Sequence, residues 1–142
     1  MKVFVSYAFT GEDFAVLRER LNKLRSVFDS LGVEYYINTF APEWRSMMDR
    51  AATGGEFLHF ALKELRTSDA VLVLNTSERR SEGMLMEIGA AVAMGKKIIL
   101  AQHQSSVGKT YLPTVADTTF VWQTEQELLD NLKVYLSDQN QR

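Results

Sequence analysis

The sequence predicts an α/β protein whose five parallel strands form a sheet sandwiched by helices. Apolar runs that suit strands alternate with segments that suit helices along the chain. Ala70–Asn75 and Lys97–Gln102 are short apolar runs with β-branched residues, a pattern typical of strands buried on both faces. Gly83–Gly95 lies between them and has helical character, and parallel neighbours need such a crossover. This alternation favours a three-layer arrangement, Rossmann-like or flavodoxin-like.

Three further runs complete the predicted sheet. Lys2–Ser6 is short and apolar, which suits a central strand. Val33–Ile37 is the second strand, and Thr118–Trp122 is the fifth. The whole chain, residues 1–142, is expected to form a single domain, because 142 residues suffice for one core.

The first helix is predicted by periodicity and by a capping signal. Apolar residues recur at spacings of three and four after Asp13, which indicates an amphipathic helix. Thr10 with Asp13 three residues later resembles a capping box. The helix is therefore expected to begin near Gly11 and to end at about Ser30.

Three other helices follow from similar patterns. Thr124 with Glu127 is a second capping box, at the start of a terminal helix whose last residues, Ser137–Arg142, are expected to fray. Gly83–Gly95 carries one charge and is apolar nearly all round, so it is expected to be buried. These helices are Glu56–Thr67, Gly83–Gly95 and Glu125–Leu136.

The segment Thr39–Gly55 has two open interpretations. It contains Pro42 and a pair of glycines, and a short helix is expected at Glu43–Ala52. A long insertion beside a crevice is often a lid over the site. The alternative is a helical connection that makes no contact with a ligand.

Composition excludes several classes of function. The net charge of -2 gives no basic field for nucleic acid or an anionic membrane. The absence of cysteine excludes disulfides, thiol catalysis and zinc-thiolate sites. His59 and His103 show no metal-ligand spacing, so no metal and no cofactor are expected. The sequence shows no signal peptide or membrane span, and a cytoplasmic protein is expected.

Glu87 is the leading candidate for a catalytic residue. It lies on an apolar helix, and no lysine or arginine stands three or four residues away to pair with it. A buried charge without a local partner usually has a distant partner or a use. Ligands of open parallel sheets bind beyond the carboxyl ends of the strands. Glu87 is therefore expected to face that crevice, although pairing with a distant arginine is the structural alternative.

Ser81 is the leading candidate for a binding residue. It stands just before the Glu87 helix, where its hydroxyl and the free N–H groups favour an anion. A plain N-cap is the alternative role. The other residues expected to bind the substrate are Gly83 beside it, Ser6, Tyr7, Ala8 and Phe9 at the end of the first strand, Asn75 at the end of the third, and Thr110.

Ser81–Lys96 (SEGMLMEIGAAVAMGK) resembles the signature of the nucleoside 2-deoxyribosyltransferases and of the related deoxynucleoside 5′-monophosphate N-glycosidases. The resemblance extends over most of the chain and is strongest in Asp69–Leu100. It implies that Glu87 is the nucleophile. It also implies phosphate binding by Ser81, because the monophosphate glycosidases have a serine there and the transferases an aspartate.

Two positions depart from this resemblance. Ala61 stands where the family usually carries an aspartate, and Phe4 replaces the usual tyrosine of the first strand. Glu64 lies one turn further along the same helix and is a candidate substitute for the missing aspartate.

A second resemblance competes with the first. Val3–Asp13 (VFVSYAFTGED) resembles the opening box of TIR domains, some of which cleave NAD. TIR enzymes also place a serine six residues before a catalytic glutamate, usually with Trp-Cys between them. Gly83 and Met84 occupy those two positions here, so the resemblance to TIR domains is the weaker of the two.

These observations predict an enzyme that cleaves the N-glycosidic bond of a nucleoside 5′-monophosphate by hydrolysis or transfer, through a glutamate nucleophile. A TIR-like NAD-cleaving enzyme and a non-catalytic nucleotide sensor are the alternatives. The only partner expected besides the nucleotide is another copy of the chain, in a homodimer or larger oligomer. The resemblance and apolar residues expected near the crevice, Phe120 and Trp122, suggest this, with the loop Gly108–Tyr111 reaching a neighbouring site.

Overall fold

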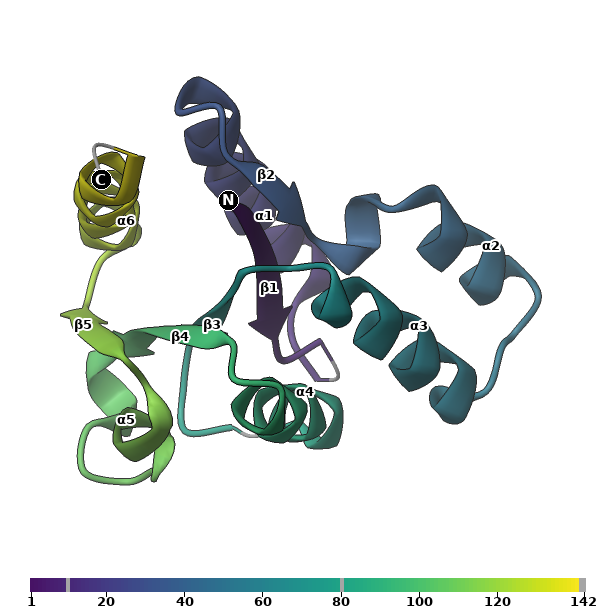
Figure 1. Cartoon of the computed structure of the whole chain (residues 1–142). Coiled ribbons are helices and arrows are strands. Elements are labelled where there is room, and N and C mark those ends of the chain that lie inside the picture. The colour runs from purple at the N-terminus through teal and green to yellow at the C-terminus, as the bar shows by residue number, and fades with distance from the viewer. Residues whose placement is uncertain (10, 80, 141–142) are drawn as a thin grey trace.

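The computed structural model describes residues 1–9, 11–79 and 81–140, and contains the predicted five-stranded parallel sheet (Figure 1). The strand order is β2-β1-β3-β4-β5, and each neighbouring pair is parallel. The fold is therefore the Rossmann-like, flavodoxin-like arrangement that the sequence predicted. The strands are β1 (Lys2–Tyr7), β2 (Glu34–Tyr36), β3 (Ala70–Asn75), β4 (Lys97–His103) and β5 (Thr118–Trp122).

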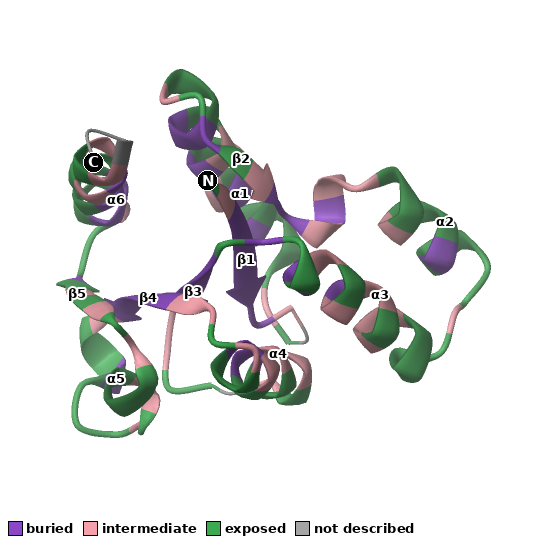
Figure 2. Ribbon diagram, in the orientation of Figure 1, coloured by how far each residue is buried: buried purple, intermediate pink, exposed green. Residues whose placement is uncertain are grey.

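Two hydrophobic layers cover the two faces of the sheet. Helices α1 (Phe14–Ser30) and α6 (Glu125–Asn140) pack on one face, and α3 (Gly54–Arg66) and α4 (Glu82–Ala93) pack on the other. Side chains alternate along β1, so Val3 and Val5 join the first layer and Phe4 the second. Figure 2 shows the buried strands at the centre of the molecule. None of the described helices is long and apolar enough to cross a bilayer.

Helix α1 begins later than the sequence predicted. Asp13 is its N-cap, and the Asp13 carboxylate accepts hydrogen bonds from the N–H groups of Ala15 and Val16 at 3.0 and 3.2 Å. Aspartate is a favoured cap residue by itself, so the helix starts at Phe14. Thr10, the other half of the predicted box, lies outside the described residues.

Helix α6 is capped as predicted but is longer. The Thr124 hydroxyl accepts a hydrogen bond from the N–H of Glu127 at 3.2 Å and donates one back to the Glu127 carboxylate. The prediction of fraying is wrong for 137–140, which are helical. Gln139 accepts a hydrogen bond at 2.9 Å from the ammonium group of Lys97 on β4, which ties the last turn to the sheet.

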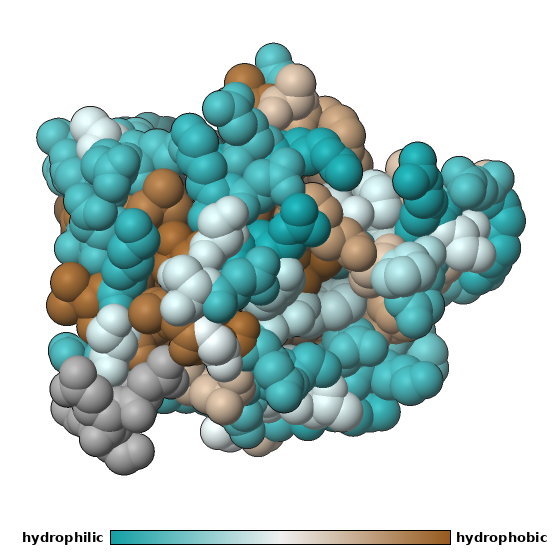
Figure 3. Space-filling model, turned by 90° about the horizontal axis from the view of Figure 1, so that it is seen from above, coloured by the Kyte–Doolittle hydropathy of each residue, from teal (hydrophilic) through white to brown (hydrophobic). Residues whose placement is uncertain are grey.

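The segment between β2 and α3 forms two short elements. A 3₁₀ turn, η1 (Asn38–Phe40), leads into α2 (Pro42–Asp49), which is shorter than the predicted helix. Ala51 then has a φ of 53°, a left-handed conformation, and Thr53 caps α3 at Gly54. Helix α2 projects from the body of the molecule, and hydrophilic residues cover much of this lobe (Figures 1 and 3).

The prediction that the Glu87 helix is buried is correct for one face of α4 and wrong for another. Met84, Ile88 and Ala91 of α4 face the sheet, but Leu85 and Val92 are 41% and 48% exposed. One apolar stripe of α4 therefore faces outward. Two short helices, η2 (Gln104–Ser106) and α5 (Leu112–Val115), were not predicted either, because a few residues carry no periodicity.

Candidate active site

A cavity of about 520 Å³ lies at the carboxyl ends of β1 and β2, between these strands and helices α2, α3 and α4. Its volume suits a small-molecule ligand. Most of its wall is apolar or aromatic, and the charged lining residues among those described are Glu82 and Glu87. It lies where open parallel sheets bind ligands.

Glu87 forms part of the cavity wall. Its Oε1 accepts a hydrogen bond from the Ser6 hydroxyl at 2.7 Å. Burial raises the pKa of Glu87 to about 7, and the bond from Ser6 opposes that rise. No described arginine or lysine forms an ion pair with Glu87. Within these residues the carboxylate has a hydroxyl partner and not the distant arginine of the structural alternative.

The contact between Ser6 and Glu87 follows from strand alternation. Ser6 is two residues after Phe4, so both side chains point to the face of the sheet that α3 and α4 cover. Ser6 is 1% exposed and does not line the cavity itself. Ser6 was expected from the sequence to be a substrate-binding residue. The alternation along Lys2–Ser6 was the signal that could have assigned it to Glu87 instead.

Ser81 and Gly83 also line the cavity, at the start of α4. The Ser81 hydroxyl oxygen accepts a hydrogen bond from the N–H of Met84 at 3.2 Å, so Ser81 is an N-cap. Accepting this bond leaves the hydroxyl proton available to a ligand. The N-cap role and the binding role of Ser81 are therefore compatible.

Tyr7 and Phe9 line the cavity from the end of β1, whereas the neighbouring Ala8 is buried and does not. The Tyr7 hydroxyl donates a hydrogen bond to Oδ1 of Asn38, which also lines the cavity. Burial raises the pKa of Tyr7 to about 12, so the hydroxyl stays protonated. Asn38 was not predicted as a site residue, although it directly follows a predicted strand.

An aromatic wall of three residues, Phe9, Trp44 and Phe57, closes one side of the cavity. The ring centroids of Trp44 and Phe9 are 5.8 Å apart, and those of Trp44 and Phe57 are 6.4 Å apart. Trp44 belongs to α2, so α2 lies against the cavity. Part of 39–55 therefore forms the cavity wall, where the lid interpretation places it. Trp44 and Phe57 were not singled out from the sequence.

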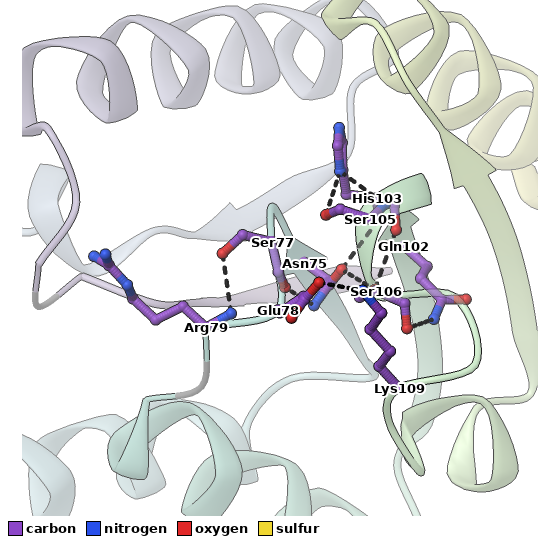
Figure 4. A network of polar contacts seen from close by, with 9 residues as sticks. All are labelled: Asn75, Ser77, Glu78, Arg79, Gln102, His103, Ser105, Ser106 and Lys109. Atoms are coloured by element: carbon purple, nitrogen blue, oxygen red, sulfur yellow. Dashed lines mark hydrogen bonds and ion pairs between the residues drawn. The ribbon is translucent and has the colours of Figure 1, made fainter.

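The structure places Asn75 and Thr110 outside the cavity lining. Asn75 Oδ1 accepts hydrogen bonds from the Ser106 hydroxyl at 2.7 Å and from the His103 N–H at 3.1 Å. The Asn75 amide nitrogen donates to the carbonyl of Ser77. Figure 4 shows this network joining the loops after β3 and β4. Thr110 instead accepts from the N–H of Leu112 at the start of α5.

The structure shows what surrounds Ala61 and Phe4, the two residues that depart from the family resemblance. Ala61 lines the cavity, and the Phe4 ring stacks on Tyr36 with centroids 5.2 Å apart. Glu64 does not line the cavity, and its carboxylate pairs with the Lys2 ammonium at 3.0 Å. The expectation that Glu64 replaces the missing aspartate is therefore wrong, because Lys2 holds its carboxylate elsewhere.

Trp122 was expected to be exposed near the crevice, and this is wrong. Trp122 is 2% exposed, and the guanidinium of Arg20 lies 5.3 Å from its ring centre. Phe120 is partly buried against the core that α1 and α6 cover. Among residues 1–9, 11–79 and 81–140, no group of three or more His, Cys, Asp or Glu side chains could hold a metal ion.

Solved structures with this fold include two enzymes that act on N-glycosidic bonds. The Clostridium botulinum CMP N-glycosidase BcmB superposes with a TM-score of 0.65 at 23% identity, over 95% of this chain and 99% of that one. The 2-deoxyribosyltransferase of Bacillus psychrosaccharolyticus superposes with a TM-score of 0.53 at 16% sequence identity, and the match covers 91% of this chain and 90% of that one. A conserved protein from Enterococcus faecalis V583 superposes with a TM-score of 0.64 at 14% sequence identity, and the match covers 95% of this chain and 98% of that one. At these identities the likeness establishes the fold.

No curated protein matches the chain significantly. The sequence does match the family described as nucleoside 2-deoxyribosyltransferase, over residues 9–132. This range contains Phe9, Ser81 and Glu87 of the cavity. The matched range covers most of the chain, and the protein therefore belongs to the nucleoside 2-deoxyribosyltransferase family, whose enzymes work on the N-glycosidic bond.

Proposed function

We propose that this protein cleaves the N-glycosidic bond of a nucleoside 5′-monophosphate, with Glu87 as the nucleophile. The observation that carries the proposal is the partly buried Glu87 carboxylate, which accepts a hydrogen bond from Ser6 in a cavity that Ser81 also lines. A nucleophile and an anion-binding helix start therefore share one cavity. The CMP N-glycosidase among the structural neighbours supports a nucleotide substrate.

The first step is attack by Glu87 on C1′ of the sugar. Ser6 engages Oε1, so Oε2 is assigned to form the bond to C1′. The C1′–N bond breaks as this bond forms, and its electron pair leaves with the base. The transition state resembles an oxocarbenium ion, and the product is a glycosyl ester of Glu87.

The second step releases the sugar. A water molecule attacks C1′, the ester bond to Glu87 breaks, and the carboxylate is regenerated. The water proton passes to solvent or to the departed base, so the balance is nucleotide plus water to free base plus sugar 5-phosphate. If a second base attacks instead of water, the outcome is transfer.

Ser81 is proposed to bind the 5′-phosphate. Its hydroxyl and the N–H groups of the first turn of α4 stand where the helix dipole favours an anion. Glu82 in that turn opposes an anion, but its side chain is exposed and solvent screens its charge. Gly83, Tyr7 and Phe9 complete the proposed contacts from the cavity wall.

A turnover screen tests the function directly. Purified protein is incubated with ribo- and deoxyribonucleoside 5′-monophosphates, the free nucleosides and NAD, and released base is measured. The proposal predicts base release from at least one monophosphate and much less from its nucleoside. NAD cleavage without base release from any monophosphate would support the TIR-like alternative. Binding of a monophosphate without turnover would support the sensor.

A homodimer or larger oligomer is also proposed. The exposed apolar stripe of α4, with Leu85 and Val92, supports it because such stripes often mark interfaces. Tyr111 in the loop Gly108–Tyr111 is 85% exposed and is a candidate to reach a neighbouring cavity. Light scattering at micromolar concentration should give at least a dimer, and an active monomer would contradict this. A cytoplasmic location remains a prediction of the sequence.

A further inference from the structure

We propose that Asn38 contacts the departing base and donates an N–H to the acceptor atom that is bonded to the ring carbon beside the glycosidic nitrogen. That acceptor is O2 of a pyrimidine or N3 of a purine. The inference rests on the proposed function, because it names the residue that assists bond cleavage by Glu87. Asn38 was not among the site residues expected from the sequence.

Asn38 lines the same cavity as α4 but belongs to a different element. It is the first residue of η1, directly after β2, and β2 pairs with β1 at the edge of the sheet. Asn38 and Glu87 line the same cavity, from the end of β2 and from α4 respectively. A sugar bonded to Glu87 would therefore have Asn38 within the same enclosure.

Tyr7 fixes which way the Asn38 amide points. The Tyr7 hydroxyl donates to Oδ1 of Asn38, and its raised pKa of about 12 keeps it a donor. The oxygen end of the amide is thus occupied. Among the described residues, no acceptor bonds to Nδ2 of Asn38, which leaves two N–H donors for a ligand.

The chemistry of the cavity calls for such a donor. When the C1′–N bond breaks, the electron pair left on the glycosidic nitrogen is delocalised through the adjacent ring carbon onto O2 of a pyrimidine or N3 of a purine. The charged lining residues that the structure describes, Glu82 and Glu87, are both acidic. In the proposed reaction Glu87 bonds to C1′ of the sugar. Glu82 is next to Ser81, where the 5′-phosphate is proposed to bind. A neutral amide therefore stabilises the leaving base, which afterwards takes a proton from water.

The test compares leaving groups. Single-turnover release of base is measured for the best monophosphate and for an analogue whose base leaves more readily because it carries an electron-withdrawing substituent, 5-nitro or 5-fluoro on a pyrimidine or 2-fluoro on a purine. Asn38→Ala should slow the ordinary substrate by about a hundredfold to a thousandfold, as loss of one preorganised donor does elsewhere. It should slow the activated substrate by less than about tenfold.

Two further variants separate this role from support of the fold. Asn38→Asp keeps an acceptor for the Tyr7 hydroxyl but lacks the N–H donors, and it should show the same dependence on the leaving group. Tyr7→Phe removes the hydroxyl that orients the Asn38 amide and keeps the N–H donors, so its loss should be smaller and should show the same dependence on the leaving group.

Each outcome decides the inference. Equal slowing of both substrates by Asn38→Ala and Asn38→Asp would overturn the role of Asn38 and leave the proposed function standing. Absence of monophosphate cleavage by the wild type would overturn the proposed function, and this inference with it. A selective loss on the ordinary substrate supports both.

Discussion

The Ser6 hydroxyl donates a hydrogen bond to Oε1 of Glu87 at 2.7 Å, and so connects the central strand β1 with helix α4. The bond holds the carboxylate in one orientation at the cavity wall. It also favours the charged form of a group whose burial favours the neutral form. Ser6 is therefore proposed as a positioning residue for the nucleophile.

Removing this bond should shift the pH dependence of the reaction. The nucleophile must be ionised, so kcat/KM of the wild type should rise with pH up to about 7 and then level off. Ser6→Ala should move that rise upward by about one to two pH units, since a hydrogen bond to a charged group contributes about 1.5–3 kcal/mol. Ser6→Thr keeps a hydroxyl and is the control. If kcat/KM of Ser6→Ala rises over the same pH range as that of the wild type, Ser6 does not position the nucleophile.

Glu87 should also make folding stability depend on pH. Its pKa is raised from 4.5 to about 7 in the folded protein, so the folded state binds this proton more tightly than the unfolded state. Stability should therefore fall as pH rises from about 4.5 to about 7 and change no further from this group above that. The difference corresponds to about 3 kcal/mol.

Glu87→Gln tests this by urea unfolding at pH 5 and pH 8. The glutamine stays neutral, so the variant should gain stability relative to wild type by up to about 3 kcal/mol between the two pH values. Glu34→Gln, at an exposed position of β2, is the control and should behave as wild type. Parallel pH profiles for wild type and Glu87→Gln would mean that the Glu87 pKa is not raised.

Ser81 should contribute to both stability and phosphate binding. Ser81→Ala removes an N-cap worth about 1 kcal/mol and should lower the melting temperature. It should also raise KM for a monophosphate by about tenfold to a hundredfold, through the loss of one charge-assisted hydrogen bond. Activity on the free nucleoside should hardly change.

Two variants separate the effects of Ser81. Ser81→Asp keeps a good cap but repels phosphate, so KM for the monophosphate should rise while the melting temperature holds. Thr124→Ala removes the matching cap of α6, away from the cavity, and should lower stability without changing KM. Equal increases in KM for nucleoside and monophosphate in Ser81→Ala would rule out phosphate binding by Ser81.

The strands and the location of the cavity could be predicted because their signals are local. Ala70–Asn75 and Thr118–Trp122 are strands over the predicted residues, since apolar runs bounded by polar loops mark buried strands. Helix ends were harder. Asp13 caps α1 by itself, and Lys97 holds the end of α6 through a contact distant in sequence.

The residues of the cavity wall could not all be predicted, because they are set by contacts between segments that are distant in the sequence. Trp44 of α2 meets Phe9, which follows β1, through a contact between segments distant in sequence. Trp122 was expected near the crevice, but the outer strand β5 turns it toward Arg20 and α6. Glu64 could be placed on the helix of Ala61, but its pairing with Lys2 could not be foreseen.

The most direct test of the central claim is to trap the glycosyl ester on Glu87. A 2′-deoxy-2′-fluoroarabinonucleoside 5′-monophosphate carries an electron-withdrawing fluorine, which destabilises the oxocarbenium-like transition states and slows release of the sugar. Intact-protein mass spectrometry should detect one added sugar phosphate, and peptide mapping should place it on Glu87. Glu87→Gln should bind the analogue and acquire no adduct. An adduct on another residue, or wild-type turnover by Glu87→Gln, would contradict the role of Glu87 as nucleophile.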